Sequence, residues 1–195
     1  MKCNIHIAKL ILITFFVILF GTIIGATEYT YEVALIQTIL LYLYSYWGHV
    51  FAHNVSQEYP INIINTHISI HHNESTYYSR EFNLLMESIN NFAGFFVLII
   101  IQYLTGVKIL SNRIIFYSVF LYIGLHIFYY SITKNNYHVQ HHKTPEFNYS
   151  PELLDIIFRT KYNNDYDNEL SMTYELIPVV VSYYLVCSLI ANRVL

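Results

Sequence analysis

The amino-acid sequence predicts an all-α integral membrane protein, a bundle of about four to five transmembrane helices with a histidine-rich helical cap on its cytosolic side. Three observations predict this class. The 195-residue chain is 55% hydrophobic and only 12% charged, whereas a soluble domain carries about 25% charged residues. Five segments are apolar over roughly the 20 residues that a bilayer requires. Nine of the ten histidines lie beside or within those segments.

The five apolar segments are residues 8–26, 33–52, 92–110, 114–132 and 174–192. Lys2 and Lys9 precede the apolar run of the first, which is interpreted as an uncleaved signal anchor; a signal peptide cleaved after Gly25-Ala26 is the alternative. The second segment ends in aromatic residues typical of the membrane interface, namely Tyr42, Tyr44, Tyr46 and Trp47. No internal repeat or linker divides the chain, so we expect one membrane domain.

The distribution of positive charge predicts the orientation. Residues 27–32 contain no lysine or arginine, whereas most basic residues lie at the N-terminus or in two polar stretches, 53–91 and 133–173. Cytoplasmic loops carry an excess of such residues, so both stretches are expected to face the cytosol, in the endoplasmic reticulum or an equivalent internal membrane. Lys108 and Arg113, between the third and fourth segments, oppose this orientation. The chain has a net charge of −3 and no basic patch, which argues against nucleic acid as a partner.

Three clusters and one isolated residue account for nine of the histidines. The clusters are His49 and His53 in G-H-V-F-A-H, His67, His71 and His72 in H-I-S-I-H-H, and His138, His141 and His142 in H-V-Q-H-H. His126 stands alone in the fourth apolar segment, about two turns before its cytosolic end. Residues three or four apart share one face of a helix. Four separate elements are therefore expected to direct imidazoles at one volume near the membrane surface.

This histidine pattern predicts metal binding. Imidazole is the commonest protein ligand of transition metals, and ionisable groups at membrane depth are costly unless they have a role. Nine imidazoles exceed what one ion accepts, which is about four for zinc and about six for an octahedral ion, so two ions are predicted. Cys3 and Cys187 lie far apart in the sequence and indicate no thiolate site. His6, outside the clusters, is interpreted as an ordinary interfacial or capping residue and not as a metal ligand.

The ordered motifs resemble those of the fatty acid hydroxylase/sterol desaturase superfamily of membrane di-iron enzymes. That family shows H-x3-4-H, H-x2-3-H-H and H-x2-H-H, with a further histidine in the helix before the last cluster. Residues 148–150 (N-Y-S) and 154–160 (L-D-I-I-F-R-T) resemble the family's N-[FY]-G and W-D-x-[LF]-F-G-T. The resemblance covers about 45–162. Residues 1–44 are expected to form the membrane anchor and the start of the second transmembrane helix, and 163–195 a tail with a possible fifth helix.

The sequence also departs from the family pattern. Ser150, Leu154 and Arg159 replace the usual Gly, Trp and Gly. Tyr130 occupies the position where some hydroxylases carry one more histidine. These departures bear on the substrate more than on the chemistry, and they leave open a protein that binds metal without turnover.

The resemblance implies an O2-dependent oxidoreductase with two iron ions, for which zinc can substitute in purified protein. It implies a fatty-acyl, sphingolipid or sterol substrate in the lipid bilayer, with electrons from NAD(P)H through a separate cytochrome b5-type donor. Partners of the metal ligands accept their second ring N–H. Asp155, Asn148 and Glu152 are candidates for this role, and Asp155 is favoured because it matches the family's aspartate. The other interpretation of Asp155 is a helix cap or a surface charge.

Two other classes of function remain. A membrane zinc hydrolase would also use histidines in a lipid setting, but it needs a carboxylate base, and the sequence contains no H-E-x-x-H. A haem-binding helical bundle would need only one or two axial histidines and would leave the paired clusters unexplained. The motifs do not separate hydroxylation from desaturation, because both begin with the same hydrogen abstraction.

Overall fold

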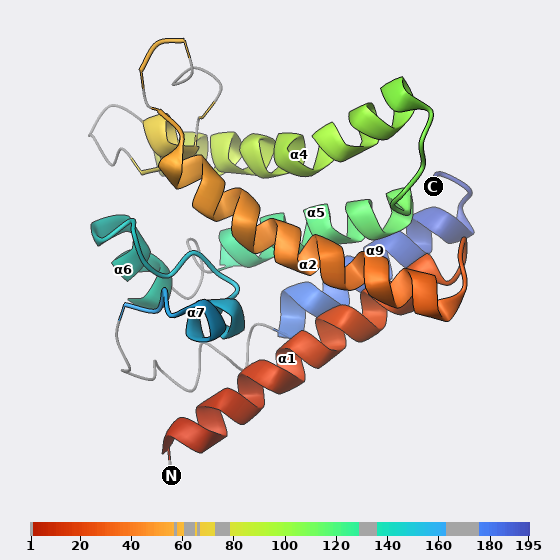
Figure 1. Cartoon of the computed structure of the whole chain (residues 1–195), viewed down its shortest axis with the longest axis horizontal. Coiled ribbons are helices and arrows are strands. Elements are labelled where there is room, and N and C mark those ends of the chain that lie inside the picture. The colour runs from red at the N-terminus through yellow and green to blue at the C-terminus, as the bar shows by residue number, and fades with distance from the viewer. Residues whose placement is uncertain are drawn as a thin grey trace.

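The computed structural model describes residues 2–56, 58–60, 65, 67–72, 79–128, 136–162 and 176–195. These residues form helices and no strand, which confirms the predicted all-α class. The helices are α1 (Lys2–Gly25), α2 (Tyr31–Asn54), the π-helix η1 (His67–His71), α4 (Arg80–Thr105), α5 (Asn112–Ile127), α6 (Asn136–Lys143), α7 (Glu152–Phe158) and α9 (Leu176–Ala191) (Figure 1).

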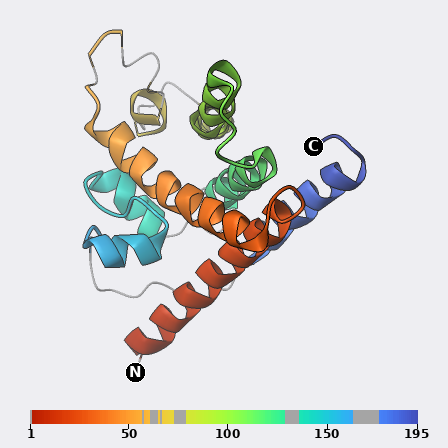
Figure 2. The same cartoon turned by 45° about the vertical axis from the view of Figure 1, so that its right-hand side comes forward.

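The long helices pack around α5. Helix α1 packs along α2, and α5 contacts α1, α2, α4 and α9. The short helices α6 and α7 lie at the end of the bundle where α2 ends and α1 begins, while the turns 26–30 and 106–111 lie at the opposite end (Figures 1 and 2). The N-terminus and the histidine-rich stretches thus share one end of the molecule, as the predicted topology requires.

Close packing joins α1 to its neighbours. Gly25 faces Ala34 of α2, and a Cβ atom on this glycine would lie 2.9 Å from the Cβ of Ala34. Small residues let helix backbones approach closely, which is the common device in helix pairs that lack a large hydrophobic driving force. Ile24, Tyr117 and Val179 form the adjacent core between α1, α5 and α9.

The outer surface of the bundle is strongly apolar. Phe15 of α1, Leu104 of α4 and Tyr184 of α9 are 56%, 76% and 74% exposed. Soluble monomers rarely expose extended apolar surfaces, whereas lipid accommodates them. Within the described residues, two stretches are long and apolar enough to cross a membrane, Ile5–Gly25 and Glu81–Thr105.

The larger number of spans stays a prediction. Helices α5 and α9 are apolar, but each has 16 described residues, which extend about 24 Å against a hydrocarbon core of about 30 Å. Helix α2 has 24 residues, but its tyrosines and histidines lower its mean hydropathy. The structure therefore supports two candidate spans in place of the four to five expected.

Helix α4 begins earlier than the apolar segment 92–110 suggested. It starts at Arg80, where the Ser79 hydroxyl accepts a hydrogen bond from the Phe82 N–H, a favourable N-cap. Its first half looks polar in the sequence because Asn83, Glu87 and Asn91 recur every fourth residue. All three are buried on one helix face, so the polar stretch is a helix with a polar inner face.

The two basic residues that oppose the predicted orientation are ion-paired. Glu28 lies 3.5 Å from the Lys108 ammonium and 3.7 Å from Arg113 Nε. Its other carboxylate oxygen accepts a hydrogen bond from the Ser111 hydroxyl. Lys108 and Arg113 therefore tie the α4–α5 turn and the start of α5 to the α1–α2 turn, which gives them a structural reason to lie at this end of the bundle.

Candidate metal centre

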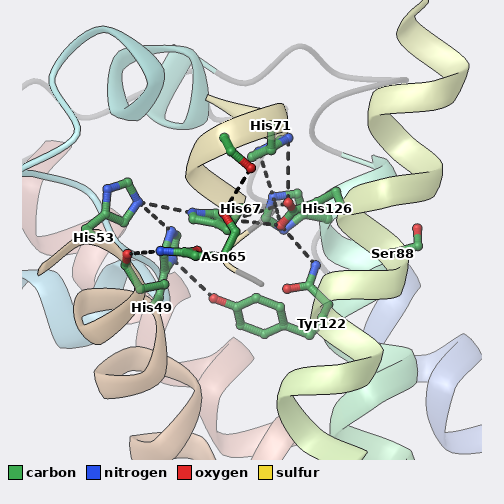
Figure 3. A network of polar contacts seen from close by, with 12 residues as sticks. His49, His53, Asn65, His67, His71, Ser88, Tyr122 and His126 are labelled. Atoms are coloured by element: carbon green, nitrogen blue, oxygen red, sulfur yellow. Dashed lines mark hydrogen bonds and ion pairs between the residues drawn. The ribbon is translucent and has the colours of Figure 1, made fainter. Parts of the chain in front are cut away.

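The structure brings together all nine histidines that the sequence predicts as ligands. They come from α2, η1, α5 and α6, and His72 directly follows η1. We call His49, His53, His67, His72 and His141 the His49 group, and His71, His126, His138 and His142 the His71 group. Figure 3 shows His49, His53 and His67 turned toward one another, with His71 and His126 beside them.

The second histidine cluster does not form the α-helix that its spacing suggested. Residues His67–His71 form a π-helix, in which the His72 N–H donates to the His67 carbonyl oxygen at 3.1 Å. The i→i+5 bond widens the turn, so His67, His71 and His72 all reach the site, whereas an α-helix would turn His72 aside. Asn65 fixes the approach to η1 by donating its side-chain amide to the Ala52 carbonyl at the end of α2 (2.6 Å).

Hydrogen bonds fix the tautomers of three imidazoles in the His49 group. His49 Nδ1 contacts the Tyr149 carbonyl oxygen, and His141 Nδ1 lies 2.6 Å from the Phe147 carbonyl oxygen. His67 Nδ1 lies 3.3 Å from each carboxylate oxygen of Glu87. Carbonyl and carboxylate oxygens only accept, so each Nδ1 carries the proton and each neutral ring keeps its lone pair on Nε2.

Two of these lone pairs, those of His49 and His141, face each other. The Nε2 atoms of His49 and His141 are 3.1 Å apart, and His53 Nε2 lies 3.2 Å from His49 Nε2 and 3.1 Å from His67 Nε2. Two unprotonated nitrogens cannot hydrogen-bond to each other. Ring nitrogens that bind one ion at about 2.1 Å lie about 3.0 Å apart at a right angle and about 3.4 Å apart at the tetrahedral angle. The observed spacing is that of ligands around a shared cation.

The His71 group shows the same spacing. His71 Nε2 lies 3.3 Å from His126 Nε2 and 3.0 Å from His142 Nε2, and His142 Nε2 lies 3.1 Å from His138 Nε2. His72 lies close to both groups, and neither of its buried ring nitrogens has a hydrogen-bond partner among the described residues. An unsatisfied buried polar group costs about 1–3 kcal/mol. A bound cation would remove that cost, so the donor set fits a metal ion.

Burial keeps the imidazoles in the form that binds metal. Burial, together with the neighbouring imidazoles, lowers the pKa of His141 to about 3 and that of His142 to about 4, from 6.5. Metal ions bind only the neutral imidazole, so protons compete weakly for the site at physiological pH.

Glu87 is a site residue that the sequence analysis missed. Its carboxylate is 2% exposed and lies 3.2 Å from His126 Nε2 and 3.7 Å from His71 Nδ1, in addition to its contacts with His67. It was missed because Glu87 lies in the polar stretch 53–91, for which no helix was predicted. Asn83, Glu87 and Asn91 are four residues apart, a pattern that predicts one polar face of a helix. This pattern could have identified Glu87 from the sequence.

Asp155 was predicted to accept the second ring N–H of a histidine ligand, but it contacts the loop that orients the histidines instead. It is fully buried and accepts hydrogen bonds from Tyr149 N (3.0 Å), Ser150 N (2.6 Å), Thr160 Oγ1 (2.5 Å) and the Tyr137 hydroxyl. In the described part of the chain, none of its partners is an imidazole. It instead fixes the loop whose carbonyl groups orient His49 and His141, which makes Asp155 a positioning residue.

Asn148 holds the same loop. Its side-chain amide donates to the Tyr137 carbonyl oxygen (3.2 Å), and its side-chain oxygen accepts from the Tyr162 N–H (2.9 Å). It therefore joins α6 to the segment after α7, and among the described residues it too contacts no imidazole.

Glu152 serves neither as a partner of the ligands nor as an isolated charge. His6 Nε2 and Lys161 Nζ lie 2.7 and 2.6 Å from its Oε1. This buried cluster joins the start of α1 to α7, and His6 belongs to neither histidine group, so it has a structural role outside the metal centre. Tyr130, the other position noted in the sequence, lies outside the described residues.

Two of the unusual signature residues adopt a left-handed backbone. Ser150 has φ 64° and Arg159 has φ 61°, in the region that glycine occupies without strain. Arg159 ends α7, where its N–H donates to the carbonyl groups of Asp155 and Ile156. Leu154, the third unusual residue, is buried against Tyr46 and Tyr149.

A large cavity adjoins the His49 group. Its volume is about 1050 Å3, and it lies between α2 and α4. The lining is mainly apolar and includes Trp47, Gly48, Phe51, Ala93, Gly94, Phe95 and Val97, with His49 and His67 at one side. Ligand pockets for small molecules span about 300–1,000 Å3. A long apolar molecule could therefore reach the imidazoles from the side of the bundle.

The depressed pKa values predict that the metal-free protein loses stability in acid. For His53, His141 and His142, the folded pKa lies below the unfolded value of 6.5. The unfolded chain thus binds more protons below about pH 6.5, and the free energy of unfolding falls as the pH falls further. Asp155, whose pKa burial raises from 3.8 to about 6, has the opposite effect below pH 6, but the histidines outnumber it.

Thermal unfolding of chelator-treated protein between pH 7.5 and pH 5 measures this dependence. We expect a midpoint that is constant above pH 6.5 and declines below it. His141→Asn, which keeps a donor near the Phe147 carbonyl, should show a shallower decline. A midpoint that is unchanged or rises toward pH 5 would contradict the assignment of neutral, buried imidazoles.

Arg159→Gly should stabilise the fold. A residue with a Cβ atom is destabilised by about 1–2 kcal/mol in the left-handed region, and glycine removes this cost. Glycine also makes the unfolded chain more flexible, which offsets part of the stabilisation. The expected net gain is about 0.5–1 kcal/mol, seen as a higher midpoint in thermal unfolding. Arg159→Ala is the matched control, since it removes the same exposed side chain but keeps the Cβ atom; equal midpoints for the two variants would refute the explanation.

The chain was compared with family models, with curated proteins and with solved structures, and none of the three comparisons found a match. The function is therefore argued from the geometry of the site and from the residues that build it.

Proposed function

We propose that this protein is a membrane-bound, O2-dependent di-iron oxidoreductase that hydroxylates or desaturates a lipid. The observation that carries the proposal is the convergence of nine imidazoles, six buried and three half-buried, in two groups. The Nε2–Nε2 distances that join eight of the nine are 3.0–3.3 Å. Two groups support two ions, one in each. Imidazole donors suit iron, and an incompletely saturated ion retains positions for oxygen.

The residues around the site would bind and orient the metal ligands, and the metal would supply the oxidation chemistry. Bound iron would supply the activation of O2 that oxidation of an unactivated C–H bond requires, which acid–base chemistry alone cannot provide. The Phe147 and Tyr149 carbonyl groups hold His141 and His49 in the tautomer that presents Nε2. Asp155 keeps those carbonyl groups in place. Such outer partners typically change metal affinity or activity 10–100-fold when they are removed.

The cavity supports a lipid as the substrate. It lies against α4, which is one of the two candidate membrane spans, and its lining is mainly apolar. A fatty-acyl, sphingolipid or sterol molecule would enter from the bilayer between α2 and α4. Its reactive carbon would lie next to His49 and His67, which line the same cavity.

The resemblance to the fatty acid hydroxylase/sterol desaturase superfamily adds support of another kind. Ser150 and Arg159 replace glycines of that family's signature, and both have the positive φ that favours glycine. The proposal places the histidine end of the bundle in the cytosol, in the endoplasmic reticulum or an equivalent membrane. A cytochrome b5-type donor would deliver electrons from NAD(P)H at this end.

A zinc-dependent membrane hydrolase is the second candidate. Glu87 beside His126 favours it, because this carboxylate could serve as the general base for which the sequence offered no H-E-x-x-H motif. Such an enzyme would need three protein ligands for each ion, and the site offers more. Zinc alone in protein purified from iron-replete cells would favour the hydrolase.

Lipid analysis of cells that express the protein tests the function. Hydroxylated or desaturated lipids should accumulate with the wild type and fall by more than about 100-fold in His71→Ala or His141→Ala, because losing a ligand costs more than losing its outer partner. Metal content should fall too, while membrane insertion is kept. His6→Gln, which alters a histidine outside both groups, should behave like the wild type.

If the wild type produces no new lipid compared with cells that lack the protein, the proposed oxidase is excluded and a protein that binds metal without turnover is favoured. If wild type and His141→Ala produce the same amounts of new lipid, the site itself is refuted.

Filling the cavity should change which lipids react. Gly48 lines the cavity beside His49, and a Cβ atom at this position meets no atom within 4 Å. Gly48→Leu should lower turnover of long-chain substrates by about tenfold or more with metal content unchanged, while Gly48→Ala should have a small effect. Replacing glycine within a helix also favours folding by up to about 1 kcal/mol. Equal turnover by both variants would show that substrate does not use this cavity.

A further inference from the structure

Glu87 is the carboxylate that touches the histidine cluster in the described part of the chain. It is 2% exposed and projects from α4 toward histidines of both groups. Its remaining partner is Asn91, whose side-chain amide donates to Oε1 at 3.1 Å. No lysine or arginine among the described residues pairs with it.

Among the described residues, no lysine or arginine balances the charge of Glu87. Removing a carboxylate from water is costly unless a cation or several hydrogen bonds replace the lost hydration. The imidazoles are neutral in their metal-binding form, and the hydrogen-bond donors at the carboxylate are Asn91 Nδ2 and His67 Nδ1. A cation bound next to the carboxylate would balance its charge.

The position of one carboxylate oxygen fits that of a ligand. Oε1 lies 3.2 Å from His126 Nε2, which in turn lies 3.3 Å from His71 Nε2. Donor atoms bound to one ion at about 2.0–2.2 Å are about 3.0–3.4 Å apart. The Oε1 atom of Glu87 thus continues the pattern of spacings that the Nε2 atoms show within the His71 group.

Glu87 meets the His49 group in a different way. Both of its oxygens lie 3.3 Å from His67 Nδ1, while His67 Nε2 faces His53 Nε2 at 3.1 Å. Here the carboxylate contacts the rear nitrogen of a ligand and fixes its orientation.

We propose that Glu87 is an oxygen ligand of the ion in the His71 group and that it positions His67 in the His49 group. The inference rests on the proposed function only in requiring a metal ion in each group. It makes the two sites chemically unequal, since one would have an anionic oxygen donor and the other only imidazoles. The competing role for Glu87 is that of a hydrogen-bond acceptor for His67 alone.

Titration of the purified full-length chain with Co2+ separates these roles. Two backgrounds isolate the sites: His53→Ala with His141→Ala disables the His49 group, and His138→Ala with His142→Ala disables the His71 group. Glu87→Gln is then added to each, because it keeps the size of the side chain and removes the charge. We expect Co2+ affinity to fall at least 100-fold where only the His71 group remains, with a changed visible spectrum, and to fall by a clearly smaller factor where only the His49 group remains.

Asn83→Ala provides the matched control. Asn83 lies one turn before Glu87 on the same buried helix face, and among the described residues it forms no hydrogen bond with an imidazole. This variant should bind Co2+ like the wild type.

Glu87→Asp keeps the charge but shortens the side chain. Its Co2+ affinity is expected to fall at least tenfold where only the His71 group remains. This variant replaces Glu87→Gln in the test if Glu87→Gln fails to fold.

The outcomes separate this inference from the function on which it rests. If the wild type binds two Co2+ ions and Glu87→Gln loses neither, or loses affinity equally at both sites, the ligand role of Glu87 is refuted and the two-ion site stands. If the wild type binds no Co2+, the proposed function fails together with the inference.

Discussion

The structure depends on one electrostatic constraint: unprotonated imidazole nitrogens face each other inside a buried site. The carbonyl groups of Phe147 and Tyr149 accept the Nδ1 protons of His141 and His49, which leaves two Nε2 lone pairs 3.1 Å apart. This arrangement repels unless a cation lies between the rings. The loop held by Asp155 therefore orients His49 and His141. A bound ion would offset the repulsion between their Nε2 lone pairs.

The bundle is built to carry this constraint. Its outward surface is apolar, while Glu87 and the histidines lie inside, at the end covered by α6 and near α7. A carboxylate and several imidazoles cannot remain in a low-dielectric interior without partners. The mainly apolar cavity between α2 and α4 is lined in part by His49 and His67, so it adjoins the histidine site. Access for an apolar molecule and protection of a polar centre thus coexist in one small chain.

Much of the site could be predicted from the sequence, because histidine is rare enough that ordered clusters carry information. The helical class and all nine converging histidines followed from composition and spacing. The π-helix at His67–His71 could not be predicted, since a one-residue change in hydrogen bonding leaves no trace in spacing. Glu87 was missed because a polar inner helix face resembles a loop when hydrophobicity alone is considered. The indirect role of Asp155 depends on backbone carbonyl groups, which every sequence possesses.

The most direct test of the central claim is X-ray absorption at the metal edge of the purified protein, combined with its metal content. The account predicts two ions for each chain, each surrounded by light donor atoms at about 2.0–2.2 Å with the outer scattering of imidazole rings. A folded protein that binds no metal ion, or whose ions lack imidazole scattering, would contradict it.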